Sequence, residues 1–372
     1  MNATAQGALL PTYARLGVTF VDGEGSWLVD DAGKRYLDLF AGIAVVGLGH
    51  RHPAPAAAAH AQLDRLWHVS NLYYTEPMVE LSEKLSDRFG GAHAFFCNSG
   101  AEANEAAIKW ARKATGRHEI VALEGSFHGR TMGALSVTGQ PAKRAAFEPL
   151  VPGARFATPD TLAEHVGPRT AAILLEPVQG EGGVHPLGTE TLAEARALAD
   201  EHGALLILDE VQTGVGRTGA FFAWQRYGVK PDAVTLAKGL ANGLPIGAFL
   251  VSDEAPVGFE PGDHASTFGG NLVCSAAACA VLDTIDDALL AHVDELSERL
   301  QAGLAAFGEV RGLGLLLAVE LDREAGPVVE AALGRGLVIG SAGPTTLRLT
   351  PPLTLSLDEA DQALAIMAEV VA

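Results

Sequence analysis

The amino-acid sequence predicts an α/β fold, with a large domain built on a mostly parallel sheet and a smaller α+β domain. Between about residues 94 and 252, short apolar runs alternate with amphipathic or Ala-rich stretches, which is typical of strands covered by helices on both faces. A chain of 372 residues divides into two or three domains at about 150 residues each. Hydrophobic residues make up 48% and charged residues 19%, so we expect a packed globular protein.

The elements follow in chain order. Residues 27–39 (WLVDDAGKRYLDL) predict two short strands around an Asp-Ala-Gly turn, and we assign residues 1–50 to the small domain. Residues 51–285 are expected to form the large domain, with strands at the apolar runs near residues 94, 119, 171, 204, 233 and 246. Residues 286–372 are expected to complete the small domain. Helices are predicted at 272–285, at 291–307, near 326 and from 357, and strands near 315, 338 and 345.

Charge and cysteine usage exclude several classes of protein. The chain has 26 basic and 45 acidic residues, and a net charge of −19 repels nucleic acid and anionic membranes. Cys97, Cys274 and Cys279 form no CxxC pair, so we expect small core residues in a reducing compartment and no metal site. The first residues lack a signal-peptide pattern, and no apolar run reaches the roughly 18 residues of a membrane span, so we expect a cytoplasmic protein.

The segment Gly214–Gly219 (GVGRTG) matches the dinucleotide-binding pattern GxGxxG. In that fingerprint the first glycine directly follows a strand and the loop opens a helix, whereas here DEVQT intervenes and an aromatic run follows. A cofactor-free nucleotide-binding or regulatory protein remains an alternative that rests on this motif alone. His50 and His52 are expected to be loop caps. Ser126 and His128 lack a nucleophile elbow, so a serine hydrolase is not expected.

Lys238 stands out among the seven lysines of the chain. It follows the apolar run AVTLA, whereas the others lie where a solvated charge is expected, Lys143 and Lys230 in loops among them. Burial would lower its pKa and favour the neutral amine, the form that attacks carbonyl groups. Asp209 ends the apolar run ALLIL, at the sheet edge where ligands gather. A lysine and an acid in this arrangement fit a cofactor whose ring serves as an electron sink.

Such a cofactor also needs a phosphate site and a stacking ring. Ser99, Gly100 and Ala101 precede a predicted helix, whose free N–H groups attract anions. The same Ser99-x-x-Glu102 sequence is also a capping box, which needs no ligand. Phe127 is the candidate for the stacking ring.

Eight segments resemble the class III (subgroup II) aminotransferases, which use pyridoxal 5'-phosphate (PLP) and have the type I fold of PLP-dependent transferases. The resemblance spans nearly the whole chain in family order, and its LWHVSNLYYTEP and FHGRTMG segments are most similar to the acetylornithine branch. The matching segments are GHRHP at 49, NSGAEANEAAIK at 98, SFHGRTMGALSVTGQ at 126, EPVQGEGGV at 176, LLILDEVQTGVGRTG at 205, LAKGLANGLPIGA at 236, STFGGNLVCSAA at 266 and LRLTPPL at 347.

The resemblance implies a role for each matching residue. Lys238 would bond the cofactor's aldehyde carbon and Asp209 would hold its ring nitrogen. Arg130 would bind the α-carboxylate of an acylated diamine, and Arg348 that of glutamate. Glu181 would pair with Arg348 when a substrate that lacks this carboxylate is bound. The resemblance implies one more contact with the substrate, Ser266. Its remaining contacts with the cofactor are Gln212, Val211, Phe127, Ser99, Gly100, Ala101 and, from the neighbouring subunit of a homodimer, Thr267.

The implied reaction moves the distal amine of N2-acetylornithine to 2-oxoglutarate, giving N-acetylglutamate 5-semialdehyde and glutamate in arginine biosynthesis. An apolar Ile43, where ornithine aminotransferases carry a tyrosine, suits an acylated nitrogen. Transaminases of N-succinyl-diaminopimelate, succinylornithine or a carrier-bound lysine precursor are the nearest alternatives. Ornithine or 4-aminobutyrate aminotransferase and glutamate-1-semialdehyde aminomutase are more distant ones.

Overall fold

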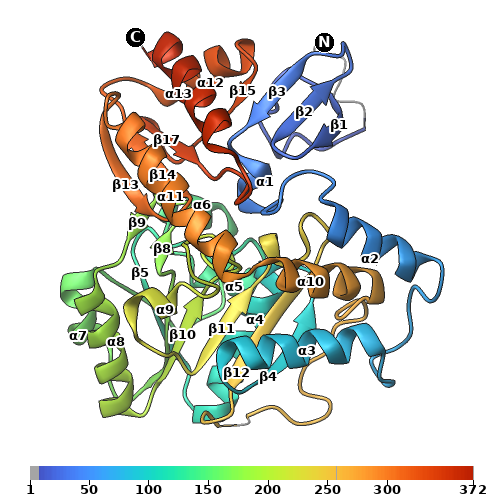
Figure 1. The fold of residues 1–372 in the computed structure, drawn as a ribbon. Coiled ribbons are helices and arrows are strands. Elements are labelled where there is room, and N and C mark those ends of the chain that lie inside the picture. Colours follow the sequence, from blue (N-terminus) through green and yellow to red (C-terminus); the bar gives the residue numbers. More distant parts are fainter. Residues whose placement is uncertain (1–7, 257, 372) are drawn as a thin grey trace.

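The computed structural model describes residues 8–256 and 258–371, and a seven-stranded sheet forms its centre (Figure 1). Only β12 runs antiparallel to its neighbours, so the predicted, mostly parallel sheet is confirmed. The sequence did not predict β6, whose ARFA segment is short and only partly apolar. The strand order is β4 (Ala92–Cys97), β12 (Gly247–Ser252), β11 (Ala233–Leu236), β10 (Leu205–Asp209), β7 (Thr170–Leu175), β5 (Glu119–Leu123) and β6 (Ala154–Ala157).

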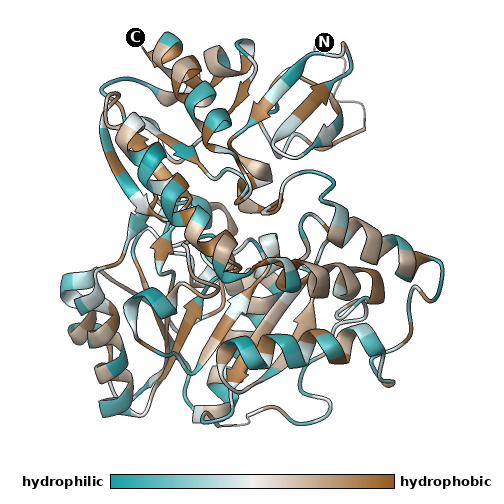
Figure 2. Cartoon of the chain, in the orientation of Figure 1, coloured by the Kyte–Doolittle hydropathy of each residue, from teal (hydrophilic) through white to brown (hydrophobic). Residues whose placement is uncertain are grey.

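Alternate residues of these strands pack into two cores on opposite faces, because successive side chains of a strand point to opposite sides. On β7, Ile173 and Leu175 join one core, and Ala172 and Leu174 join the other. Helices therefore cover both faces, and apolar residues concentrate on the central strands while polar ones lie outward (Figure 2). The helices of this part are α2 (Pro53–Leu63), α3 (Glu76–Phe89), α4 (Gly100–Thr115), α5 (Met132–Ser136), α6 (Pro141–Arg144), α7 (Leu162–His165), α8 (Thr189–His202), α9 (Trp224–Tyr227) and α10 (Leu272–Thr284).

The beginning of the chain forms β1 (Phe20–Glu24), β2 (Trp27–Asp30) and β3 (Arg35–Asp38), so the predicted pair of strands is confirmed and β1 is an addition. The short helix α1 (Ala41–Ala44) follows. Strand β15 (Leu337–Val338) comes from the far end of the chain and pairs in parallel with β3. The two ends of the chain are thereby joined in one sheet.

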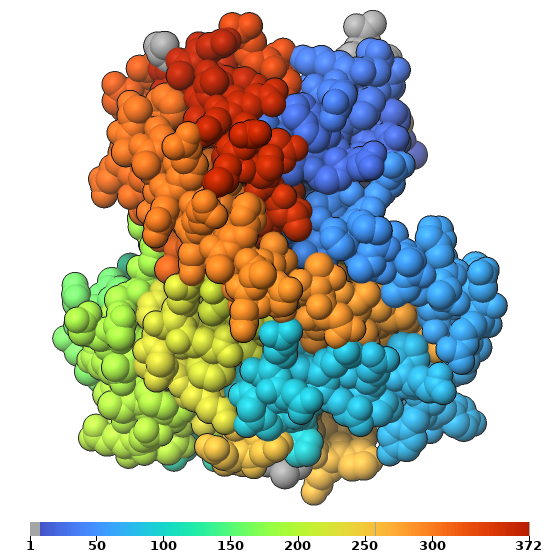
Figure 3. Space-filling view, viewed as in Figure 1, coloured from blue at the N-terminus to red at the C-terminus, as the bar shows by residue number. Residues whose placement is uncertain are grey.

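The C-terminal part adds a second four-stranded sheet under three helices. Its core also contains Leu37 and Leu39 from the start of the chain, and in the space-filling view the blue N-terminal and red C-terminal residues form one lobe over the larger one (Figure 3). We propose on this basis the division into residues 1–50, 51–285 and 286–372. The elements are β13 (Glu309–Leu313), β14 (Leu316–Glu320), β17 (Thr346–Leu349) and β16 (Gly340–Ser341), with α11 (Asp287–Leu304), α12 (Ala325–Gly334) and α13 (Leu357–Val371).

Two smaller expectations are also resolved. Cys97, Cys274 and Cys279 are buried free thiols, as predicted. None of the helices in the described part of the chain is both long and apolar enough to cross a bilayer.

Candidate active site

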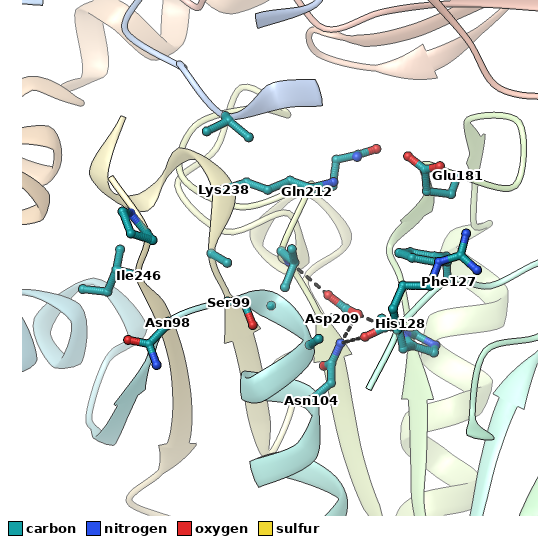
Figure 4. Close-up of a pocket in the computed structure, with 18 of the residues that line it drawn as sticks. Asn98, Ser99, Asn104, Phe127, His128, Glu181, Asp209, Gln212, Lys238 and Ile246 are labelled. Atoms are coloured by element: carbon teal, nitrogen blue, oxygen red, sulfur yellow. Dashed lines mark hydrogen bonds and ion pairs between the residues drawn. The ribbon is translucent and has the colours of Figure 1, made fainter. Parts of the chain in front are cut away.

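A cavity of about 400 Å³ opens at the carboxyl edge of the central sheet, where the ends of the parallel strands meet (Figure 4). Segments that follow β4, β5, β7, β10 and β11 line it, together with Val45 from the beginning of the chain. Ten of the predicted site residues are among the lining residues: Lys238, Asp209, Val211, Gln212, Ser99, Gly100, Ala101, Phe127, Arg130 and Glu181.

Lys238 lies directly after β11 and begins the 3-10 turn η4 (Lys238–Ala241), in a left-handed backbone conformation with φ 42°. Its Nζ atom makes no hydrogen bond or ion pair with any residue that the structure describes. Burial lowers the pKa of Lys238 to about 8, against the raising effect of Glu181, and Arg348 lowers it further. The neutral amine that the sequence argument requires is therefore well populated near pH 8.

Asp209 accepts hydrogen bonds from four donors at the end of β10. Asn104 Nδ2 lies 2.7 Å and His128 Nδ1 2.8 Å from its Oδ2, while the Val211 N–H and the Thr235 hydroxyl lie 3.1 and 3.3 Å from its Oδ1. Asn104 is itself fixed, because it accepts from the Thr235 hydroxyl and donates to the backbone carbonyl of His128. The carboxylate is thus held rigidly at the floor of the cavity, below Lys238 and Gln212 (Figure 4).

Sequence reasoning missed Asn104 and His128 as site residues. Asn104 is a polar residue on the otherwise apolar stripe of α4, between Ala103 and Ala107, and it is 1% exposed. That break in an apolar stripe was a usable signal. No comparable signal marked His128, because its contact with Asp209 joins positions 81 residues apart.

The start of α4 fits a phosphate group. Ser99 is the N-cap and accepts from the N–H of Glu102, so the capping interpretation of this segment is also correct. A side chain on Gly100 would lie 2.7 Å from the methyl groups of Val211, so only glycine permits this approach of the two loops. The 16-residue helix directs its dipole and its free N–H groups at the cavity.

Gln212 supports the presence of a ligand most directly. Both polar atoms of its buried side chain, Oε1 and Nε2, lack a hydrogen-bond partner among the described residues. His128 Nε2 is buried and unpartnered as well. Buried polar groups are nearly always paired, so these atoms fit a polar aromatic ring such as that of PLP.

Glu176 is a further residue that the sequence argument quoted in a motif but did not assign. It is buried behind Phe127, accepts the N–H of Phe127 at 2.8 Å and that of Gly180 at 3.3 Å, and lines the cavity. Burial raises the pKa of Glu176 to about 7, although His128 lowers it. It connects the loop that carries Phe127 to the loop that carries Glu181.

The two predicted carboxylate-binding arginines differ. Arg348, on β17, is 2% exposed, and its guanidinium contacts Glu181 Oε1 at 2.5 Å and the carbonyl of Gly180 at 3.1 Å. Burial would raise the pKa of Glu181, but the Arg348 charge outweighs this and holds it below its usual value. Arg130 is exposed at the cavity wall, with its guanidinium 5.5 Å from the centroid of the Phe127 ring. Arg348 is therefore screened from the cavity by Glu181, whereas Arg130 is open to it.

The structure of the single chain does not bring Ser266 and Thr267 to this cavity. They line a second cavity of about 690 Å³, in which Thr267 is exposed and Ser266 Oγ lies 3.2 Å from Asn98 Nδ2. Ile43 is not among the residues that line the site either, whereas Val45 is.

The segment Gly214–Gly219 has a structural role. Arg217 is buried and donates to the carbonyls of Leu315 and Pro351, which connects the large sheet to the C-terminal part. His52 caps α2 as expected, whereas His50 has an acidic partner that the sequence did not reveal, Asp38 at 2.8 Å. No group of three or more metal-ligating side chains occurs within residues 8–256 and 258–371.

Comparisons with known proteins identify the family of this chain. The family model for class-III aminotransferases matches residues 11–371. An acetylornithine aminotransferase of Corynebacterium efficiens is 50% identical over 382 aligned positions, which cover 98% of this chain and 95% of that protein. The N-acetylornithine aminotransferase of Stenotrophomonas maltophilia has a TM-score of 0.83 at 36% identity, over 96% of both chains. An ornithine aminotransferase of Toxoplasma gondii, with PLP at partial occupancy in its active site, has a TM-score of 0.93 at 29% identity, over 99% of this chain and 92% of that one.

Proposed function

The chain belongs to the class-III aminotransferases, whose cofactor is PLP, and on that premise we propose that it transfers the distal amine of N2-acetylornithine to 2-oxoglutarate. The products are N-acetylglutamate 5-semialdehyde and glutamate, which places the reaction in arginine biosynthesis. The observation that carries the proposal is a cavity lined by an open arginine, Arg130, and by a carboxylate, Glu181, that holds a second arginine, Arg348, behind it. This arrangement suits two substrates that differ by one carboxylate.

The residues of the cavity fit PLP at each end. The start of α4 would hold the phosphate, Gln212 the ring hydroxyl and Asp209 the ring nitrogen, with Phe127 against the ring face. When bound, PLP supplies an electron sink for the pair released at the amine-bearing carbon. Lys238 would anchor the cofactor and, once released by the incoming amine, take and return the proton of that carbon.

The substrate end of the cavity binds by charge. Arg130 would accept the α-carboxylate of N2-acetylornithine through a two-pronged contact, which fixes the distal amine toward Lys238. During this half-reaction Glu181 stays on Arg348, as the structure shows the pair. In the other half-reaction the α-carboxylate of glutamate would replace Glu181 on Arg348, and the distal carboxylate of glutamate would reach Arg130.

We also propose a cytoplasmic homodimer with shared active sites. Exposed apolar side chains gather in one loop and beside the second cavity, and burying such a patch stabilises association. In that arrangement Ser266 and Thr267 would reach the partner's active site. The patch consists of Leu63, Leu66, Trp67, Leu72, Tyr73, Tyr74 and Phe268.

A spectroscopic titration of the holoenzyme tests the donor. N2-acetylornithine, added without a keto acid, should convert the yellow enzyme to the pyridoxamine form far faster than ornithine or 4-aminobutyrate does. Faster conversion by N-succinyl-diaminopimelate or succinylornithine would reassign the donor within the family. In the control variant Lys238→Ala, turnover should fall by about 10³-fold or more because the proton-transfer group is lost. Normal turnover of that variant would contradict the assignment of the site.

A further inference from the structure

Lys143 lies beside Phe127, a residue of the cavity wall, and not in the solvated loop that the sequence predicted. It belongs to α6, is half-buried, and its Nζ atom lies 4.8 Å from the centroid of the Phe127 ring. Arg130 places its guanidinium 5.5 Å from the centroid of the same ring. Two cations therefore contact a single phenylalanine that forms part of the cavity wall.

No acid neutralises this pair of cations. Within the described part of the chain, neither Lys143 nor Arg130 has a carboxylate within 4 Å. Burial lowers the pKa of Lys143, Glu181 raises it, and the positive charges of Arg130 and Arg348 lower it again. Two acids act on Lys143 from a distance, and both have other partners. Glu181 is paired with Arg348 at 2.5 Å, and Glu176 accepts the N–H groups of Phe127 and Gly180.

Contact with the ring does not by itself explain this placement. A cation over an aromatic ring is stabilised only weakly at an exposed site, and a second like charge beside it opposes that stabilisation. A carboxylate bound between the two cations would reverse the balance, because each would then be attracted to it. The arrangement is thus complete only when an anionic ligand is present.

We propose that Lys143 is a specificity-determining residue that, together with Arg130, binds the carboxylate farthest from the reacting amine. That group is the α-carboxylate of N2-acetylornithine in one half-reaction and the distal carboxylate of glutamate in the other. The inference rests on the proposed function for the first ligand, whereas the second follows from any reaction that uses glutamate. Lys143 raises substrate affinity and leaves the chemical step to Lys238.

Single-turnover kinetics of the holoenzyme test this role in the variant Lys143→Met, which keeps the length of the side chain and removes its charge. The half-saturating concentration of N2-acetylornithine should rise by about tenfold, the size expected for one charge-assisted contact, while the limiting rate stays within about twofold. N-acetylputrescine, which is the same donor without its α-carboxylate, should react equally well with both enzymes. The dependence of the half-saturating concentration on ionic strength should become shallower.

Two further variants separate charge from packing. Lys143→Arg should restore the affinity to within about threefold because it keeps the charge. Lys230→Met is the matched control, since Lys230 also lies over a phenylalanine, 5.4 Å from the centroid of Phe89, and Phe89 does not line the cavity. This variant should leave the half-saturating concentration and the limiting rate unchanged for both N2-acetylornithine and N-acetylputrescine.

The contrary outcomes are distinct from one another. Equal losses with N2-acetylornithine and N-acetylputrescine would show that Lys143 merely supports Phe127, and unchanged affinity would show that it binds no substrate. If the wild type does not react with N2-acetylornithine, the proposed function fails, and the glutamate half-reaction then decides the role of Lys143 by the same tenfold criterion.

Discussion

The floor of the cavity and its substrate end are built on opposite principles. At the floor, Asp209 is surrounded by four donors, two of which, Asn104 and Thr235, are also hydrogen-bonded to each other. At the end that we propose binds substrate, Arg348 holds the carboxylate of Glu181, and neither Arg130 nor Lys143 has a carboxylate within 4 Å among the described residues. The difference follows from what each part binds: a cofactor that stays needs a rigid environment, and two substrates that alternate need partners that exchange.

Removing the exchangeable pair should separate the two half-reactions most strongly. We expect Arg348→Ala to lower kcat/KM for glutamate by about 100-fold and that for N2-acetylornithine by tenfold or less, because only glutamate places its α-carboxylate there. Stopped-flow measurement of each half-reaction gives both values. Arg196→Ala, which breaks a partly buried pair with Asp232 at 2.8 Å outside the cavity, is the control. Equal losses in the two half-reactions would mean that the roles of the two arginines are wrongly assigned.

Disturbing the rigid floor should instead affect both half-reactions alike. Asn104→Ala removes one donor from Asp209 and one acceptor from Thr235, so we expect both kcat values to fall by about tenfold. The free energy of unfolding should fall by about 1–3 kcal/mol because buried polar groups lose partners. Denaturant titration and half-reaction kinetics measure the two effects.

Ser297→Ala provides the reference for that experiment. It removes the buried hydrogen bond, 2.6 Å long, that the Ser297 hydroxyl donates to the carbonyl of Gly314. Ser297 lies on α11, which packs into the core of the C-terminal part. The same variant should lose stability without losing activity. A change in only one half-reaction of Asn104→Ala would contradict the view that the floor serves the cofactor.

The contrast between the two regions also explains what the sequence could predict. Six of the seven strands of the central sheet, all except β6, and the positions of Lys238 and Asp209 at strand ends follow from local apolar patterns, and the structure agrees with them. The partners of Asp209 could not be derived in this way, since His128 and Thr235 meet it only through the order of the strands. Lys143 was misplaced for the same reason, because a short polar helix next to a proline resembles a loop until its neighbours are known.

The pairing of Arg348 with Glu181 joins residues 167 positions apart and came from the family resemblance alone. Strands β1, β6 and β13 were missed because their apolar positions are few and partly exposed. Local patterns therefore located the site, while the contacts that tune its charges required the assembled fold.

The last prediction concerns pH and the residue next to Asp209, and it affects stability only. Burial raises the pKa of Glu210 to about 8, against hydrogen bonds from the N–H groups of Trp224 and Ala223 that lower it. Between the ordinary carboxyl pKa of 4.5 and about 8, the folded chain keeps a proton that the unfolded chain has lost. The free energy of unfolding should therefore fall as pH rises through this window, by at most about 1.4 kcal/mol per pH unit from this group. In Glu210→Gln, denaturant titrations at several pH values should show a shallower fall, whatever the stability of the variant at one pH. An unchanged slope would mean that the burial of Glu210 does not govern the pH dependence of stability. The residues next to the floor of the cavity would then contribute no titratable group that destabilises the fold as pH rises.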